Sequence, residues 1–401
     1  MIRDRSILAL VLGEFVSRLG SQLTNLALPW FVLVTTGSPS RMSVVFAVEL
    51  APVALLGIPA GSVLHRIGPR AALLISDGVR APLVALVPLL HATGHLTFAL
   101  LLVISAAHGL FSIGYFTAQR TILPAVVGED EQLVARANSL VEGTTNLTNF
   151  LGPALAGFAI ALLGAANVLW LDAASYAVSF VVIAFLVRLR AAPADEDDVD
   201  PGGIWAGLGY LKRDRMVARA SISSLIFGFL FSILVASFPV LAYQQYDHNP
   251  RVAGALLAAF GAGSIAGSVA TYSLLGRLPG MRMSAAATIA TAAPLWLLVP
   301  DVPLVVNVVA LALCGASIPM INAPYLGMLS TRVPRALRGK VLQSLITINQ
   351  FAGPIGFLIA GPLFVHAGLH WTYALVAALA TVATANFITA VWNEPRLQEA
   401  A

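Results

Sequence analysis

The sequence has few charged residues and almost no cysteine. Of its 401 residues, 10% are charged and 58% are hydrophobic, whereas soluble globular domains have about 25% charged residues and about half apolar residues. A folded core cannot bury this much apolar surface, so lipid must cover part of it. The single cysteine, Cys314, lies in a hydrophobic stretch and excludes an intramolecular disulfide.

Several signatures of enzymes and ATP-driven pumps are also missing. The sequence contains no G-x-x-x-x-G-K-[ST] pattern, which would cradle the phosphates of ATP. The histidines are scattered, and no clustered nucleophile or spaced set of metal ligands is visible. We therefore expect no catalytic residues, no metal site and no cofactor, and we predict that the protein is not an enzyme. The energy source that remains is an ion gradient, and we expect protons.

The hydrophobic residues gather in twelve stretches, each close to the roughly 20 apolar residues that a membrane-spanning helix needs. The predicted spans are 7–35, 42–64, 71–91, 96–117, 137–163, 167–187, 218–243, 252–276, 283–299, 304–329, 341–366 and 371–392. The first span outlasts the h-region of a signal peptide and lacks a small-residue cleavage site, so we expect no cleaved leader. The predicted fold class is an all-α integral membrane protein.

The basic residues predict the orientation of these spans. Arg41 and Arg251 lie in gaps assigned to the outside and Arg18 lies within a span, whereas the others lie at the termini or in and beside the alternate gaps. Short cytoplasmic loops retain Lys and Arg in this way. We therefore predict a multi-pass protein of the cell (inner or plasma) membrane with both termini in the cytoplasm. The same bias accounts for the high isoelectric point without a nucleic-acid partner.

The chain consists of two similar halves. Pro29 and Pro239 are about 210 residues apart, and so are Arg66 and Arg277. A polar stretch separates the halves, which gives an N-terminal six-helix bundle at 1–187, a cytoplasmic linker at 188–217 and a C-terminal six-helix bundle at 218–401. Transporters built from parallel repeats bind their substrate near the middle of the membrane, between the repeats.

The connection between the second and third spans carries a motif. Residues 61–70 read GSVLHRIGPR, which resembles the signature G-x-x-x-D-R-x-G-R-R of the major facilitator superfamily, with His65 in place of Asp and Pro69 in place of a basic residue. The motif residues that match, with the two that follow at the start of the third span, are Gly61, Arg66, Gly68, Arg70, Asp77 and Arg80. The loops around Pro124 and Pro334, with residues 135–139 and 337–341, are similar to those of the macrolide-efflux and enterobactin-exporter-like branch.

This resemblance covers nearly the whole chain and implies a fold of two pseudo-symmetric six-helix bundles. In the family, the Asp of the inner loop takes part in a latch that closes the inner side. Because His65 cannot supply a negative charge, the latch would use Asp77 or be absent. Alternatively, Arg66 and Arg70 serve only to fix the topology.

The fifth span carries a second motif, Gly152, Pro153 and Gly157, which resembles the antiporter motif of exporters although Ala156 replaces a glycine. Small residues allow helices to approach closely, and proline permits bending. The motif therefore favours export, with ordinary helix packing as the alternative.

Three ionisable residues lie at bilayer depth, where such groups are costly and usually functional. They are Glu14 and Arg18 in the first span and Glu49 in the second. We predict that they couple transport to protons, because a glutamate whose distance from Arg18 changes between two states also changes its proton affinity. The alternative is a permanent Glu14–Arg18 pair, since residues four apart share a helix face. We expect a structural role for Asp77, Arg80, Glu142 and Asp172, which lie near span ends and can reach water.

Uncharged polar residues at bilayer depth are costly if they face lipid, so we expect them to line a cavity or join helices. The candidates are Gln22, Asn25, His108, Tyr115, Asn146, Asn149, Asn322, Tyr325, Asn349 and Gln350. His108 is the weakest of these, because no carboxylate lies near it in the sequence.

We therefore predict a proton-driven secondary transporter that exports a hydrophobic or amphipathic small molecule, drug-like or siderophore-like, by alternating access. A lipid or lysolipid flippase on the same fold and an importer of a small metabolite are the alternatives. The expected partners are the small-molecule substrate and the lipid bilayer. The sequence says nothing about the oligomeric state, and a monomer is consistent with it.

Overall fold

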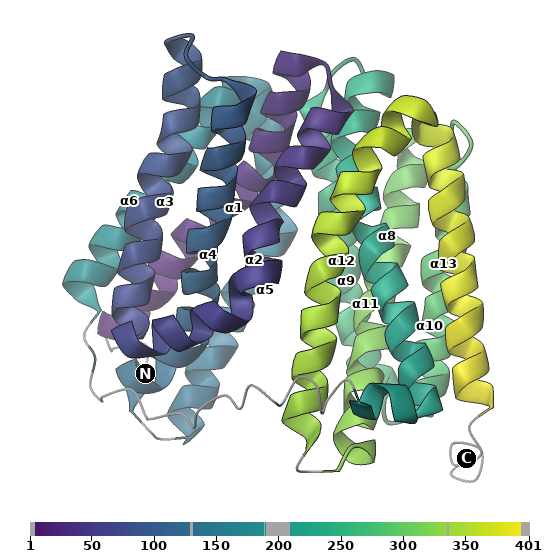
Figure 1. Cartoon of the computed structure of the whole chain (residues 1–401). Coiled ribbons are helices and arrows are strands. Elements are labelled where there is room, and N and C mark those ends of the chain that lie inside the picture. The colour runs from purple at the N-terminus through teal and green to yellow at the C-terminus, as the bar shows by residue number, and fades with distance from the viewer. Residues whose placement is uncertain (1–4, 129–130, 188, 190–208, 335–336, 394–401) are drawn as a thin grey trace. The chain divides into compact units, whose positions relative to one another are not determined.

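A computed structural model describes residues 5–128, 131–187, 189, 209–334 and 337–393. Within these ranges the chain is built from long helices joined by short turns (Figure 1). The helices before the central linker are α1 (Arg5–Thr36), α2 (Pro39–Ile67), α3 (Pro69–Ala92), α4 (Phe98–Val127), α5 (Glu131–Leu163) and α6 (Ala165–Leu186). Those after it are α8 (Arg215–Gln245), α9 (Pro250–Leu274), α10 (Gly280–Leu295), α11 (Leu304–Arg332), α12 (Arg338–His366) and α13 (Gly368–Trp392).

Eleven of the described helices are long and apolar enough to cross a membrane. The predicted span at 283–299 corresponds to α10, which has 16 residues and continues as a short 3-10 helix, Trp296–Leu298. Pro294 explains the change of helix type, because proline lacks the N–H and crowds the preceding turn. The all-α membrane fold is confirmed.

The chain divides into two compact units. The first comprises Met1–Asp198 with Ala242–Gly254, and the second comprises Val199–Leu241 with Ala255–Ala401. Most of the predicted linker, 188–217, lies outside the described residues. The first unit therefore holds α1 to α6, and the second holds most of α8 to α13.

Hydropathy located the spans but underestimated the lengths of α4 and α5. The predicted inner loop around Pro124 is wrong, because α4 continues to Val127. Ile122, Leu123 and Val126 explain the extension, since they are buried in an apolar cluster of the first unit. Likewise α5 begins at Glu131, so Arg136 lies in a helix and not in a loop. These helices continue beyond the apolar residues that marked them as spans.

The signature segment at 61–70 is also mostly helical, because α2 runs to Ile67 and α3 begins at Pro69. Gly68 alone turns the chain between them, with φ 79° and ψ 156°. Residues with a side chain hardly ever adopt this backbone conformation. Pro69 at the first position of α3 suits a helix start, since its fixed φ is helical and its missing N–H would have no helical partner. This explains why proline is tolerated at the position where the signature has a basic residue.

Two contacts appear in both units and reveal the internal repeat. The Ser76 hydroxyl of α3 donates to the carbonyl of Phe111 in α4, and the Ser284 hydroxyl of α10 reaches the carbonyl of Ile321 in α11. A Cβ on Gly109 of α4 would overlap the carbonyl oxygen of Glu49 in α2. A Cβ on Gly315 of α11 would overlap the carbonyl oxygen of Phe260 in α9 in the same way. The second and fourth helices of each unit therefore touch through a glycine.

Large apolar side chains face outward from the helices. Phe185 is 75% exposed, Tyr272 88% and Trp371 70%. A soluble protein rarely exposes many such residues. Cys314, by contrast, is 2% exposed, and its thiol donates to the carbonyl of Thr291. This distribution fits helices that are surrounded by lipid.

Candidate functional site

The first unit contains a buried chain of polar contacts that begins at Glu49. The Oε1 atom of Glu49 in α2 lies 3.0 Å from Nδ1 of His108 in α4. Their side chains are 15% and 10% exposed, respectively. His108 is therefore no isolated histidine: no carboxylate lies near it in the sequence, but the fold brings Glu49 to it from another helix.

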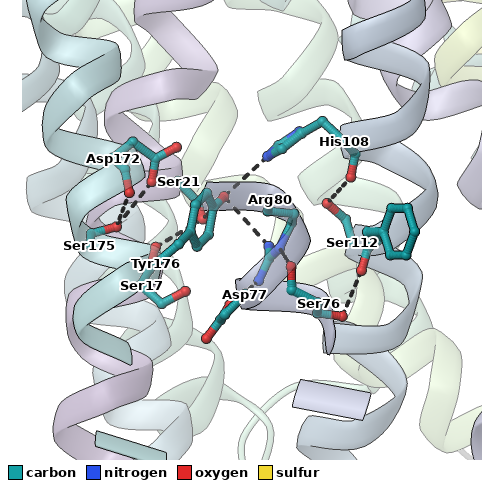
Figure 2. Close-up of polar contacts among 11 residues, drawn as sticks. Ser17, Ser21, Ser76, Asp77, Arg80, His108, Ser112, Asp172, Ser175 and Tyr176 are labelled. Carbon is teal, nitrogen blue, oxygen red and sulfur yellow. Dashed lines mark hydrogen bonds and ion pairs between the residues drawn. The ribbon is translucent and has the colours of Figure 1, made fainter. Parts of the chain in front are cut away.

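The chain of contacts continues through Tyr176 in α6, whose hydroxyl lies 3.2 Å from Nε2 of His108 (Figure 2). The same hydroxyl lies 3.5 Å from Nη1 of Arg80 and 2.9 Å from Oγ of Ser21 in α1. Tyr176 is fully buried. One hydroxyl group thus joins helices α1, α3, α4 and α6.

Arg80 and Asp77 end the chain on α3. Nη2 of Arg80 donates to Oδ1 of Asp77 at 2.6 Å, and the side chains are 3% and 0% exposed. The Arg80 guanidinium lies 4.7 Å from the ring centre of Tyr115 and 4.3 Å from that of Tyr176. Two aromatic faces and a carboxylate thus stabilise a cation that lies away from water. We call Glu49, His108, Tyr176, Ser21, Arg80 and Asp77 the first-unit polar network.

Two glycines bring the helices of this network together. Gly109 follows His108 and allows the backbone of α4 to touch that of α2 beside Glu49. Gly20 precedes Ser21, and a Cβ there would overlap Ser175 and Asp172 of α6. Small residues permit this close approach of helices in membranes. The network therefore depends also on Gly20 and Gly109, which have no polar side chain but allow its helices to approach each other.

Arg18 does not make the predicted contacts with glutamate. Its guanidinium donates to Oε1 of Gln119 in α4 and lies 5.8 Å from the ring centre of Tyr115. Among the described residues neither carboxylate oxygen of Glu14 has a hydrogen-bond partner, although Glu14 is only 1% exposed. The alternative, a permanent Glu14–Arg18 ion pair, is therefore not among the contacts of the described residues, and the role of Glu14, Arg18 and Glu49 in proton coupling stays a prediction. A helical wheel places Glu14 and Arg18 on one face of α1, but it cannot show that Gln119 of α4 lies against Arg18.

The prediction that Asp77, Arg80 and Asp172 reach water or headgroups is also wrong. All three are buried, and Asp172 accepts a hydrogen bond from Ser175 at 3.1 Å. Packing of α1, α3 and α6 covers them, which position along a helix cannot reveal. Glu142, in contrast, is exposed.

The residues of the inner signature separate in the structure. Arg70 donates to the carbonyl of Ala184, near the end of α6, at 2.6 Å. Such carbonyls lack helical partners and attract cations. Asp77 pairs with Arg80 and not with Arg70. Gly61 and Arg66 lie in α2, and their side chains fall outside the described residues.

The helix 5 motif makes room for a polar side chain. Gly152 of α5 lies against Gln22 of α1, and a Cβ at Gly152 would overlap the side-chain carbons of Gln22. Nε2 of Gln22 donates to Oδ1 of Asn149 at 2.6 Å. Pro153 and Gly157 lie further along the same helix. The exporter role of this motif stays a prediction.

The other candidate polar residues fall into two groups. In the first unit, Asn25 donates to Gln22 at 3.1 Å, Tyr115 is buried, and Asn146 is exposed. In the second unit, Tyr325 lies 3.2 Å from Ser221, and Asn349 accepts a hydrogen bond from Ser224 at 3.4 Å. Asn322 and Gln350 are exposed. Their place in a substrate cavity stays a prediction.

The second unit lacks the charges of the first-unit polar network. Gly315 matches Gly109, so Phe260 stands where the first unit has Glu49, and Cys314 stands where it has His108. No group of three or more His, Cys, Asp or Glu within the described ranges could hold a metal ion. The ionisable chemistry of the described spans is thus concentrated in the first unit.

Comparisons with known proteins agree with this architecture. A family model described as Major Facilitator Superfamily matches residues 10–357. The multidrug efflux pump Tap of Mycolicibacterium fortuitum is 29% identical over 378 residues, which cover 92% of this chain and 91% of that protein. Its namesake in Mycobacterium tuberculosis (strain ATCC 25618 / H37Rv) is 28% identical over 386 residues, with 94% and 90% coverage. The crystal structure of the nucleoside transporter NupG superposes with a TM-score of 0.75 at 13% identity, covering 96% and 98% of the two chains. At that identity the likeness concerns the fold alone.

Proposed function

Because this chain belongs to the major facilitator superfamily, we propose that it exports a hydrophobic or amphipathic small molecule from the cell in exchange for protons. The proposal places it in the cell membrane with both termini in the cytoplasm. Two relatives that match it over nearly their full length are named multidrug efflux pumps, which supports the direction of transport and the substrate class. The alternating basic gaps support the orientation.

The observation that carries the proton coupling is the contact of 3.0 Å between Glu49 and His108. A carboxylate and an imidazole at this distance can share one exchangeable proton. The pair lies at bilayer depth, where ionisable groups are costly unless they have a role. A membrane potential of 100 mV supplies about 2.3 kcal/mol for each net charge that crosses. It can therefore drive the exchange of one proton for an uncharged molecule, whereas the exchange of one proton for a monovalent cation is driven by the pH gradient.

Glu14 is the second candidate for proton coupling. It is buried, and within the described residues its carboxylate oxygens have no hydrogen-bond partner. The charges of Arg18 and Asp77 act on it. Because Glu49 lies within hydrogen-bonding distance of a titratable side chain and no such contact is described for Glu14, the Glu49–His108 pair is the stronger assignment.

The test is transport of ethidium, an amphipathic cation, into inverted membrane vesicles. The wild type should accumulate the dye when the vesicle interior is acidified, and a protonophore should abolish the accumulation. Glu49→Gln should insert normally and lose the proton-driven accumulation. The matched control is Glu142→Gln, since Glu142 is exposed and lies outside the first-unit polar network. Undiminished proton-driven uptake by Glu49→Gln would refute the assignment.

A further inference from the structure

The Tyr176 hydroxyl has more hydrogen-bonding neighbours than it has protons to give. It lies within hydrogen-bonding distance of His108 Nε2, Arg80 Nη1 and Ser21 Oγ. A phenol carries one proton and accepts through two lone pairs, whereas arginine only donates. Tyr176 can therefore donate to His108 or to Ser21, but not to both at once.

Ser21 is under the same restriction. Its Oγ lies 2.9 Å from the carbonyl oxygen of Ser17, one helical turn earlier in α1, and this oxygen can only accept. Ser21 has one proton, so it can donate to the Ser17 carbonyl or to the Tyr176 hydroxyl. The direction of the Tyr176–Ser21 bond therefore decides whether Ser21 stays bound to Ser17.

The number of protons on the Glu49–His108 pair sets this direction. In one state the Glu49–His108 pair holds two protons. One lies between Glu49 and Nδ1 of His108, and the other is on Nε2, which donates to Tyr176. Tyr176 then donates to Ser21, and Ser21 donates to the Ser17 carbonyl. All the observed contacts are satisfied in this state.

When the pair holds only one proton, His108 keeps Nδ1–H toward Glu49 and its Nε2 becomes an acceptor. Tyr176 then turns its hydroxyl proton to His108. Ser21 can donate its single proton either to Tyr176 or to the Ser17 carbonyl, so one of these two hydrogen bonds is lost. A buried polar contact without its proton is unfavourable. The proton leaves from the pair, and the hydroxyl protons of Tyr176 and Ser21 only rotate.

We propose that Tyr176 is the positioning residue that transmits the protonation state of Glu49–His108 to helix α1. This inference rests on the proposed proton antiport. The receiving residue, Ser21, precedes Gln22, which bonds to Asn149 of α5. Release of the proton thus alters α1 beside the polar pair that Gln22 makes with α5, and this links proton release to the helices that hold candidate substrate contacts.

Other ionisable groups surround this relay and enter its pH dependence. Glu49 faces His108 from α2. Asp77 and Arg80 face Tyr176 from α3, and Asp172 on α6 interacts with both His108 and Tyr176. Tyr115 on α4 separates Arg80 from Arg18 and Glu14 on α1. In the contacts described above, none of these groups offers another hydrogen-bond route from His108 to Ser21. Removal of the Tyr176 hydroxyl should therefore interrupt the path from His108 through Tyr176 to Ser21.

The second unit offers a matched control. The hydroxyl of Tyr373 in α13 donates to Ser237 in α8 at 3.0 Å, so there too a buried tyrosine of the last helix bonds to a serine of the first. Tyr373→Phe removes a comparable bond between helices outside the first-unit polar network. Ser21→Ala acts on the receiving end of the relay and gives a second, independent variant.

The experiment uses full-length protein in proteoliposomes with ethidium as the probe. Two rates are measured: dye transport driven by a pH gradient, and dye exchange at equal pH on both sides. Tyr176→Phe and Ser21→Ala should lose about tenfold in gradient-driven transport, the effect of one hydrogen bond to a charged group, and should retain exchange. Their exchange rate should also lose its dependence on pH. Tyr373→Phe should keep both rates and the pH profile.

The outcomes separate this inference from the proposed function. If wild-type transport ignores the pH gradient, both are wrong. If the wild type is proton-driven and Tyr176→Phe matches it, only the role of Tyr176 is wrong. Equal loss of both rates in Tyr176→Phe, or loss of coupling in Tyr373→Phe, would indicate a purely structural role and would overturn the inference as well.

Discussion

Arg80 donates to Asp77 at 2.6 Å from the next turn of the same helix, and neither side chain reaches the surface. Removing one member of such a pair leaves an uncompensated buried charge, which costs about 3–5 kcal/mol. Asp77→Asn should therefore strongly lower the thermal stability of the detergent-solubilised protein.

A double-mutant cycle checks this expectation. The variant with both Asp77→Asn and Arg80→Gln should be more stable than Asp77→Asn alone, because the unpaired cation is gone. Thermal unfolding of the two single variants and the double variant gives the coupling energy. Simple additivity of the two substitutions would show that the pair contributes little.

Gly109→Ala should separate α2 from α4. The new Cβ would overlap the backbone carbonyl of Glu49, which cannot rotate away as a side chain could. Forcing extra atoms into a packed contact costs about 1–3 kcal/mol. We expect lower thermal stability and loss of proton-driven ethidium transport in inverted vesicles. Gly57→Ala is the control, because a Cβ there meets no atom within 4 Å. If both variants behave alike, the close approach at Gly109 does not position Glu49.

Asp214 should make the stability depend on pH. Its carboxylate accepts from Arg332 at 2.5 and 3.1 Å and from the amides of Met216 and Val217 at the start of α8. Partial burial acts to raise the pKa of Asp214, but these hydrogen bonds and the charge of Arg332 outweigh it and hold the pKa below its ordinary value. Such a carboxylate stabilises the folded state above its unfolded-state pKa of about 3.9, and this contribution is lost as the pH falls through the lower folded-state value.

Two substitutions measure this contribution. Asp214→Asn should keep the helix cap and lose the ion pair, whereas Asp214→Ala should also lose the cap, at a further cost of about 1 kcal/mol. The difference in melting temperature between wild type and Asp214→Asn should be full at pH 6 and should shrink below about pH 4. A difference that stays constant with pH would argue against the ion pair as its source.

The proposed orientation predicts which loops are accessible from outside the cell. Thr93 and Arg277 are exposed and lie in turns assigned to opposite sides. A membrane-impermeant maleimide should label Thr93→Cys in intact cells and should label Arg277→Cys only after the membrane is opened. Cys314 is buried, so the parent protein provides a background with little labelling. The reverse pattern would invert the topology.

The sequence was sufficient for the spans but not for the contacts between them. Apolar stretches located the helices, because each span must satisfy its own backbone in lipid. They missed the end of α4, because packing by Ile122 and Val126 sustains that helix beyond its apolar span. They also missed the Glu49–His108 contact, because the two residues lie on different helices. Gly109 was the available signal, and its match with Gly315 in the second half marks where α2 and α4 touch.

The repeated glycine contact has a consequence for the history of the chain. At both Gly109 and Gly315 the partner is a main-chain oxygen, that of Glu49 and of Phe260 respectively. The packing of one helix against the other therefore does not depend on the side chain of either partner residue. After a duplication, glutamate or phenylalanine could occupy the site while the helices kept the same spacing. An ancestral transporter could thus acquire, lose or relocate its coupling chemistry through single codon changes, without rebuilding its architecture.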